Sequence, residues 1–135
     1  MTPALIIQGA SKVIDFVAIA FGAKERMRMI DSDGSVGHAE VEIGDSVVMI
    51  SEATKDFPSM PGSIHLYVKD TDVNYQRALK AGGKSVREPA DQFYGDRSAG
   101  VKDPGGNIWW ISTHIEDVSQ AEMKKRMKAR AKQPR

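Results

Sequence analysis

Hydrophobic and polar positions in the first fifty residues change period twice, which predicts strands around a single helix. Residues 4–7 form an apolar run long enough for one buried strand. Residues 13–21 then place apolar side chains at helical spacing, and we expect Ser11 to cap this helix and Gly22 to end it. Three further strands are expected after the helix: residues 26–30, 38–43 and 46–51. The expected order is strand, helix and three strands.

The strand expected at residues 38–43 alternates strictly, and this assigns its two faces. One face would carry Ala39, Val41 and Ile43, and the other His38, Glu40 and Glu42. A strand with this pattern covers a core with its apolar face. Its polar face is left to solvent or to a ligand.

The second half of the chain repeats this order of elements. Asp70, Thr71 and Asp72 supply oxygens that can cap a helix, which would end at Gly82-Gly83. Strands are expected on both sides of it: residues 63–68, 85–88, 100–102 and 107–113, with a loop at 89–97. Residues 53–62 contain two prolines and are expected to form a linker.

An offset of 61 residues aligns the two halves without a gap. The identical pairs are Leu5/Leu66, Ala20/Ala81, Gly22/Gly83, Arg26/Arg87, Gly34/Gly95, Gly44/Gly105, Ile50/Ile111 and Ser51/Ser112. Self-similarity at a fixed offset indicates two copies of one structural unit. Two such units facing each other would enclose a space, and the side chains that line it would decide the function.

The amino-acid composition excludes several kinds of functional site. The chain has 135 residues, a net charge of +1 and 41% hydrophobic residues, which is ordinary for a globular protein and gives no global indication of nucleic-acid binding. It contains no Cys, so disulfides, thiolate metal sites and a thiol nucleophile are excluded. The first residues lack the basic segment of a signal peptide, and no apolar run is long enough to span a membrane. We expect a cytoplasmic protein with no membrane partner.

The pattern changes after Thr113. Ser119 and Glu122 form a capping box that predicts a helix. Seven basic residues and no acidic ones lie from Lys124 to Arg135. We interpret them as a solvated helix end and tail. An arm that binds a polyanion or an acidic partner is the alternative.

Four stretches of residues 2–113 resemble the vicinal oxygen chelate superfamily, which includes glyoxalase I, extradiol dioxygenases and bleomycin-resistance proteins. They are AIAFG at 18–22, HAEVEIGDSVVMIS at 38–51, HLYVKD at 65–70 and YGDRSAGVKDPGGNIWWIST at 94–113. The last is similar to the DP.GN.W ending of the glyoxalase/bleomycin-resistance branch, including its PhnB-like members.

The resemblance implies an α+β fold in which two tandem βαβββ modules form a cup-shaped mixed sheet, followed by a basic C-terminal helix. One domain would then span residues 1–113, with module one at 1–52, a linker at 53–62 and module two at 63–113. Residues 114–135 would form the C-terminal helix and tail.

The resemblance also implies where a catalytic metal would bind. In metal-dependent members the ligands come from strands whose positions fall here near Thr2, Met49, Ser63 and Trp110. Hydroxyl, thioether and indole groups do not supply the imidazole and carboxylate ligands that such metals need. We predict that the metal and any cofactor are absent. A displaced site built from His38, Glu40 and His65 is the alternative.

Strand alternation predicts which residues line the cup. Trp109 and Ile111 should pack under the helices, so that Trp110 and Ser112 face the cup. The loop that contains Phe93, Tyr94 and Arg97 should hang over one end. The candidate ligand-binding residues are Trp110, Met49, His65, Tyr67, Tyr94, Arg97, Ser112 and His38. Such a lining suits a flat, partly apolar small molecule.

We therefore predict a metal-independent, non-catalytic protein that binds a small organic ligand, such as a natural product or toxic metabolite, in the manner of antibiotic-resistance proteins. The resemblance implies a homodimer, with modules paired within one chain or exchanged between chains. The alternatives are a metal-dependent lyase, isomerase or dioxygenase with displaced ligands, metal-free catalysis with His65 or His38 as general base, and an interaction module that uses the basic tail.

Overall fold

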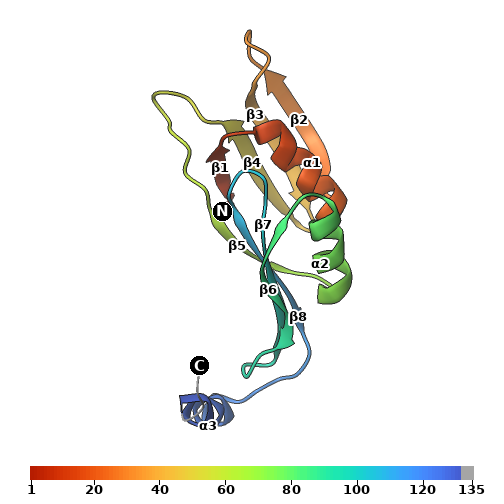
Figure 1. Cartoon of the computed structure of the whole chain (residues 1–135), viewed down its shortest axis with the longest axis vertical. Coiled ribbons are helices and arrows are strands. Elements are labelled where there is room, and N and C mark those ends of the chain that lie inside the picture. Colours follow the sequence, from red (N-terminus) through yellow and green to blue (C-terminus); the bar gives the residue numbers. More distant parts are fainter. Residues whose placement is uncertain (132–135) are drawn as a thin grey trace.

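The two halves of the chain form two four-stranded mixed sheets, each covered on one side by a helix (Figure 1). The computed structural model describes residues 1–131. The first module comprises β1 (Ala4–Ile7), α1 (Ala10–Phe21), β2 (Lys24–Ile30), β3 (Val36–Ile43) and β4 (Ser46–Glu52). The second comprises β5 (Ser63–Tyr67), α2 (Thr71–Lys80), β6 (Lys84–Asp91), β7 (Asp96–Lys102) and β8 (Ile108–His114). Helix α3 (Gln120–Ala131) follows.

Both sheets have the same topology. The first sheet has the order β1-β4-β3-β2 and the second has the order β5-β8-β7-β6. In each sheet the first strand pairs in parallel with the last strand of its module, and the other pairs are antiparallel. The α+β class and the two tandem modules are confirmed.

The strands β6 and β7 extend further than their sequence predicted. Residues 89–97 were expected to form a loop, but Ala90 pairs with Ser98 and Asp91 with Arg97. Only residues 92–95 turn the chain between the two strands. The hydrophobic pattern did not predict this part of the hairpin. The strands are extended here by backbone pairing, which does not require alternating apolar side chains.

Side chains from the ends of β4 and β8 hold the N-termini of the two helices. Ser11 was expected to cap α1, and this was wrong: α1 begins at Ala10, and the Glu52 carboxylate accepts hydrogen bonds from the backbone N–H groups of Gly9 and Ala10 at 3.0 and 3.1 Å. In the second module Thr113 Oγ1 accepts from the N–H of Thr71 at 3.0 Å. Glu52 and Thr113 are equivalent under the internal repeat.

The expected cap of α2 is confirmed. The Asp70 side chain accepts from the backbone N–H of Val73 at 3.1 Å. A carboxylate at this position satisfies one free donor of the helix and interacts favourably with its dipole.

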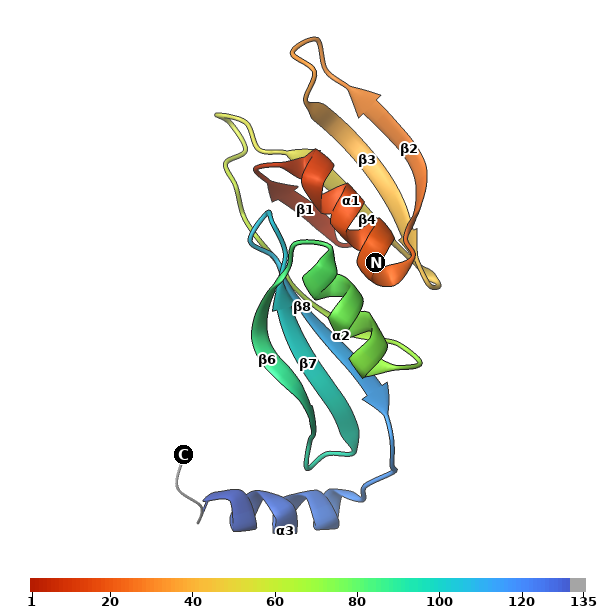
Figure 2. The same cartoon turned by 45° about the vertical axis from the view of Figure 1, so that its right-hand side comes forward.

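Helices α1 and α2 pack side by side, so both modules share one hydrophobic core. Asn74 Nδ2 of α2 donates to the carbonyl of Ala20 in α1 at 2.8 Å. At the same junction the ring centroid of Phe21 lies 5.2 Å from that of Trp109, which is fully buried. Figure 2 shows each helix crossing in front of its own sheet. The sheet faces that carry no helix, which we call the open faces, therefore point away from this core.

A buried carboxylate organises the turn between β7 and β8. Asp103 accepts from the backbone N–H groups of Gly105 and Asn107, from Asn107 Nδ2 and from Trp109 Nε1, at 2.8 to 3.0 Å. Asp103, Asn107 and Trp109 are all buried. This one side chain thus closes the turn and holds Trp109 in the core.

The C-terminal segment lies against the β6–β7 turn. Arg126 donates to the carbonyl of Phe93 at 3.0 Å, and the Arg130 guanidinium lies 4.7 Å from the Phe93 ring centroid. Ser119 accepts from the N–H of Glu122 at 3.1 Å, which confirms the expected helix start. Within residues 1–131 no helix is long and apolar enough to cross a membrane. The last basic residues of the tail, Lys132 and Arg135, fall outside the described residues.

Removing the Asp103 carboxylate should destabilise the fold strongly. Asp103→Ala leaves several buried donors without acceptors, and we expect the free energy of unfolding to fall by about 3 kcal/mol. Urea titration followed by near-ultraviolet circular dichroism of the Trp residues measures it. Asp33→Ala is a matched control because Asp33 also accepts hydrogen bonds in a turn but is exposed. Equal midpoints for the two variants would contradict this account.

Candidate functional site: the open faces of the two sheets

The open face of the second sheet carries a cluster of aromatic and polar side chains. Trp109 and Ile111 are fully buried under the helices, so Trp110 and Ser112 point to the open face as predicted. The cross-strand register places His65 beside Trp110 and Tyr67 beside Ser112. The rings of His65 and Tyr67 lie 5.1 Å apart.

The indole of Trp110 lies against the sheet. A side chain at Gly100, its partner on β7, would collide with the six-membered ring of Trp110. Trp110 Nε1 donates to Ser63 Oγ on β5 at 3.1 Å. On β6 the guanidinium carbon of Arg87 lies 4.8 Å from the Trp110 ring centroid. The ring is therefore held in one orientation across three strands.

The open face of the first sheet carries methionine side chains between charged and polar ones. Met49 on β4 pairs with Glu40 on β3, and Glu40 pairs with Met27 on β2. Met29 pairs with His38 in the same way. Because paired residues share a face, three methionines line this side of the sheet. Thioether side chains adapt their shape to what contacts them.

The residues at the positions where the resemblance places metal ligands do not fit a metal ion. Ser63 Oγ and the Trp110 N–H are already engaged with each other, and an indole N–H has no lone pair to give a metal. Met49, the third of these positions, offers only a thioether. This donor set lacks the imidazole and carboxylate groups that Zn, Fe or Mn require.

The displaced metal site is also not assembled within one chain. His38 and Glu40 lie on the first sheet, where His38 Nε2 is 3.2 Å from Glu40 Oε2, whereas His65 lies on the second sheet. Within residues 1–131 no three His, Asp or Glu side chains are placed to hold an ion.

Arg97 lies elsewhere than the sequence suggested. It belongs to β7, not to a loop, and its side chain is on the helix-covered side of the sheet. Its guanidinium donates to the carboxylates of Asp72 on α2 and Asp91 on β6 at 2.7 to 3.1 Å. The Asp72 pKa is lowered mainly by this hydrogen bond. Arg97 thus ties α2 to the sheet and does not point toward the open face.

Two other candidate residues, Tyr94 and Ser112, contribute less to the open face of the second sheet. Tyr94 lies in the β6–β7 turn, where its ring packs edge-on against Phe93 beneath α3. Ser112 is fully buried and donates to Ser98 Oγ at 3.0 Å. Of the predicted set, the second sheet brings together Trp110, His65, Tyr67 and Ser112, and the first sheet holds Met49 and His38.

A hydrogen-bonded chain at the lower end of the second sheet was missed by sequence reasoning. Asp96 is buried and accepts from Tyr67 Oη at 2.7 Å, and its other oxygen lies 3.0 Å from His114 Nδ1. The second His114 nitrogen lies 2.7 Å from Asp117. The hydrogen bond to Asp96 raises the Tyr67 pKa, and the bonds to Asp117 and then Asp96 raise the His114 pKa. The spacing of these residues contained no signal, because three elements bring them together.

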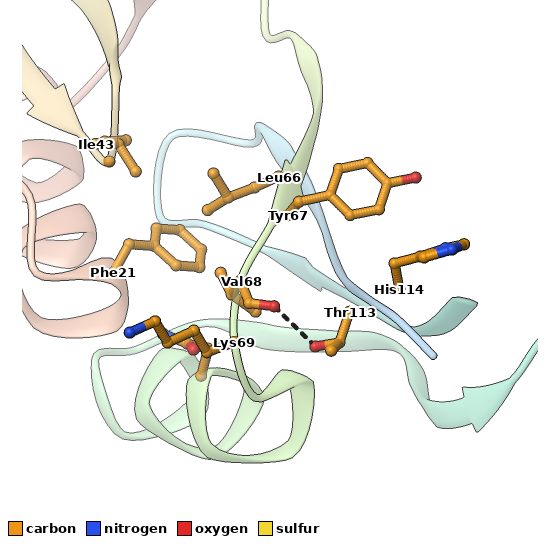
Figure 3. A pocket seen from close by; sticks show the side chains of 10 residues that line it. Phe21, Ile43, Leu66, Tyr67, Val68, Lys69, Thr113 and His114 are labelled. Carbon is orange, nitrogen blue, oxygen red and sulfur yellow. Dashed lines mark hydrogen bonds between the residues drawn. The ribbon is translucent and has the colours of Figure 1, made fainter. Parts of the chain in front are cut away.

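A hollow of about 670 Å³ lies where the two modules meet (Figure 3). Its apolar part is formed by Phe21, Ile43, Leu66 and Val68. Tyr67 and His114 border it from the other side of β5 in Figure 3. Their polar atoms are bound to Asp96, and the Thr113 hydroxyl donates to the Val68 carbonyl at 3.0 Å. Lys69 and Asn74 also line the hollow, which therefore combines apolar contact with a few polar groups at its margin.

Comparison with known proteins identifies the relatives of this chain. The model of the Glyoxalase/Bleomycin resistance protein/Dioxygenase superfamily matches residues 3–111. The uncharacterized protein Rv0887c of Mycobacterium tuberculosis is 34% identical over 141 residues, which cover 94% of this chain and 81% of that protein. The uncharacterized protein Mb0911c of Mycobacterium bovis is also 34% identical, covering 94% of this chain and 91% of its own length.

Solved structures share the fold at lower identity. TioX from Micromonospora sp. ML1 superposes with a TM-score of 0.73 at 22% identity, covering 85% of this chain and 98% of TioX. Protein PA1353 from Pseudomonas aeruginosa gives 0.69 at 18% identity, covering 86% and 98%. A glyoxalase/bleomycin resistance protein/dioxygenase from Nocardioides gives 0.65 at 17% identity, covering 89% and 85%. At these identities the likeness concerns the fold alone.

The His114 interactions predict a pH-dependent stability. Because the folded state raises the His114 pKa above its ordinary value of 6.5, protonated His114 stabilises the fold fully below pH 6.5. This contribution is lost as the pH rises through the folded-state pKa. Urea unfolding of His114→Gln between pH 6 and 9 should therefore lack a decline that the unmodified protein shows. Asp117→Asn should reduce the decline without abolishing it. Superimposable profiles for the unmodified protein and His114→Gln would refute this role.

Proposed function

Because the chain belongs to the Glyoxalase/Bleomycin resistance protein/Dioxygenase superfamily, we propose that it binds a flat, largely apolar organic molecule without a metal ion and without transforming it. Sequestration of a natural product or toxic metabolite is the role we assign to this binding. The fold alone does not select this role, since one fold supports many activities. The side chains on the open faces carry the proposal.

The single observation behind it is the hydrogen bond between Trp110 and Ser63. These two residues stand at positions where metal-dependent members place ligands, and here they bind each other. The bond fixes a large aromatic plane on the open face. An oriented indole of this kind offers a stacking surface to a planar molecule, at a cost of little conformational entropy.

We propose that a second copy of the chain completes the site. The packing of α1 on α2 turns the open faces of one chain away from their common core, so neither face is covered by the other. Large apolar side chains are consequently exposed on both, with Met29 at 58% and Tyr67 at 60% of full exposure. Exposed apolar area on this scale is typical of a surface that meets a partner or a ligand.

In the assembly we propose, the first sheet of one copy faces the second sheet of the other. Each cup then has one wall of adaptable methionine side chains and one wall that carries Trp110, His65 and Tyr67. A flat ligand would lie between Met49 of the partner subunit and the indole of Trp110. The symmetry of a two-fold dimer produces two equivalent cups.

Ligand binding should depend on the Trp110 ring. In a thermal-shift screen of aromatic metabolites and antibiotics, we expect at least one compound that raises Tm and quenches Trp fluorescence. Trp110→Ala should weaken its binding at least about tenfold, because the stacking surface is lost, and Trp110→Phe should retain most of the affinity. Undiminished binding to Trp110→Ala would refute the site. Stoichiometric metal in protein purified without chelators, lost in His65→Ala, would instead support a metal-dependent enzyme.

Mixing two inactive variants tests whether the cup is shared between copies. Met49→Lys damages only the first sheet and Trp110→Ala only the second. If cups are shared, refolding an equal mixture should restore about a quarter of the sites, because half of the dimers are mixed and each contains one intact cup. Calorimetric titration with the identified compound counts these sites. No recovery of sites, with dimers demonstrated by light scattering, would show that cups form within single chains.

A further inference from the structure

A row of four residues crosses the open face of the second sheet. The strand register places His65, Trp110, Gly100 and Arg87 side by side on β5, β8, β7 and β6. Gly100 leaves room for the indole, and the Arg87 guanidinium lies over the ring at 4.8 Å. The aromatic surface of the proposed site therefore has a cation directly upon it.

The charge of Arg87 is not balanced by a carboxylate. Among residues 1–131, no side-chain hydrogen bond or ion pair involves its guanidinium, which lies over the Trp110 ring. Four other arginines are paired with carboxylates: Arg26 with Glu42, Arg28 with Glu25, Arg97 with Asp72 and Asp91, and Arg126 with Glu116 and Glu122. Within residues 1–131, Arg77 and Arg130 share with Arg87 the lack of a carboxylate partner. A guanidinium in contact with an aromatic face keeps its N–H edge available for a planar anion.

The internal repeat shows that this arrangement distinguishes the second module from the first. Under the 61-residue offset Arg26 aligns with Arg87 and Met49 with Trp110, but the strand register places Met27, the partner of Glu40, where the second sheet has Arg87. Arg26 lies 3.6 Å from Glu42. By strand register the position of Glu42, beside Val47 on β4, is occupied in the second sheet by Lys102, beside Ile108 on β8. The first sheet therefore has a methionine at the position of Arg87 and a carboxylate beside its own Arg26, whereas the second sheet has Arg87 and a further cation, Lys102, in the next row.

Further cations surround Arg87. Lys84 pairs with Lys102 in the next row of the same open face, where Lys102 also pairs with Ile108. Asp96 at the opposite end of the face is buried and engaged with Tyr67 and His114, so it offsets none of these charges. The wall that carries Trp110 therefore presents a positive potential to whatever enters.

We infer that Arg87 and Trp110 together select planar aromatic molecules that carry an anionic group, such as a carboxylate. The ligand's ring lies beside the guanidinium, against the part of the half-buried indole that Arg87 does not cover. Its carboxylate accepts a bidentate pair of hydrogen bonds from the guanidinium. Lys102 and Lys84 strengthen the attraction without direct contact. This inference rests on the proposed function, since it specifies the ligand class of the same site.

The test compares two probes of one shape, 2-naphthoate and its neutral analogue 2-naphthamide, titrated calorimetrically into the full-length protein. We expect 2-naphthoate to bind about tenfold more tightly, because its hydrogen bonds to Arg87 are charge-assisted. Arg87→Met should reduce 2-naphthoate affinity about tenfold and change 2-naphthamide affinity by less than about twofold. Arg77→Met, which removes an arginine of α2 on the helix-covered side of the same sheet, is the matched control and should leave both affinities unchanged.

The outcomes separate this inference from the proposed function. Equal affinities for the two probes, an unchanged 2-naphthoate affinity in Arg87→Met, or a screen whose Trp110-dependent binders are neutral or cationic would overturn the anion preference. Loss of all binding in Trp110→Ala would then still support the proposed site. Failure of both probes and of every compound in the screen would overturn the proposed function, and the anion preference with it.

Discussion

Burial of Trp109 decides the orientation of the strand on which the candidate site depends. Its indole packs against Phe21 of the first module and donates to the buried carboxylate of Asp103. Because successive residues of a strand point to opposite faces, fixing Trp109 in the core forces Trp110 onto the open face. One hydrogen-bonded aromatic residue therefore joins the two modules and presents the stacking surface on the other side of the sheet.

The close approach of α1 and α2 has the largest consequence for the shape of the molecule. A side chain at Gly83 would crowd Phe16 of α1 as well as Val101 and the α2 backbone, and one at Gly105 would collide with Val13 of α1. Small residues at these contacts let the two modules share a single core. Because the helix-covered sides of both sheets are buried where the modules meet, both open faces point outward. An arrangement of this kind is suited to a site completed by a second copy.

The two modules have the same backbone arrangement, and they differ in the side chains at equivalent positions. Glu52 and Thr113 perform the same structural role with different chemistry, since each accepts from the N-terminus of its helix. At the open faces the equivalent pair Met49 and Trp110 differs in character, one adaptable and one flat. The first module thus supplies a wall of methionines interspersed with His38 and Glu40, and the second an oriented aromatic wall with a positive charge.

Sequence alone determined the order of the elements, the internal repeat and the face on which most strand residues lie, since Trp109, Ile111 and Trp110 follow strict alternation. It also identified the position of Ser63 and Trp110 through resemblance. It failed for Arg97, because a polar hairpin leaves no hydrophobic period to read. Only the tertiary structure joined Tyr67, Asp96 and His114 and turned the open faces apart. The alternation along a strand is a local pattern that predicts which face of the strand is apolar. What packs against each face depends on contacts between residues distant in the chain.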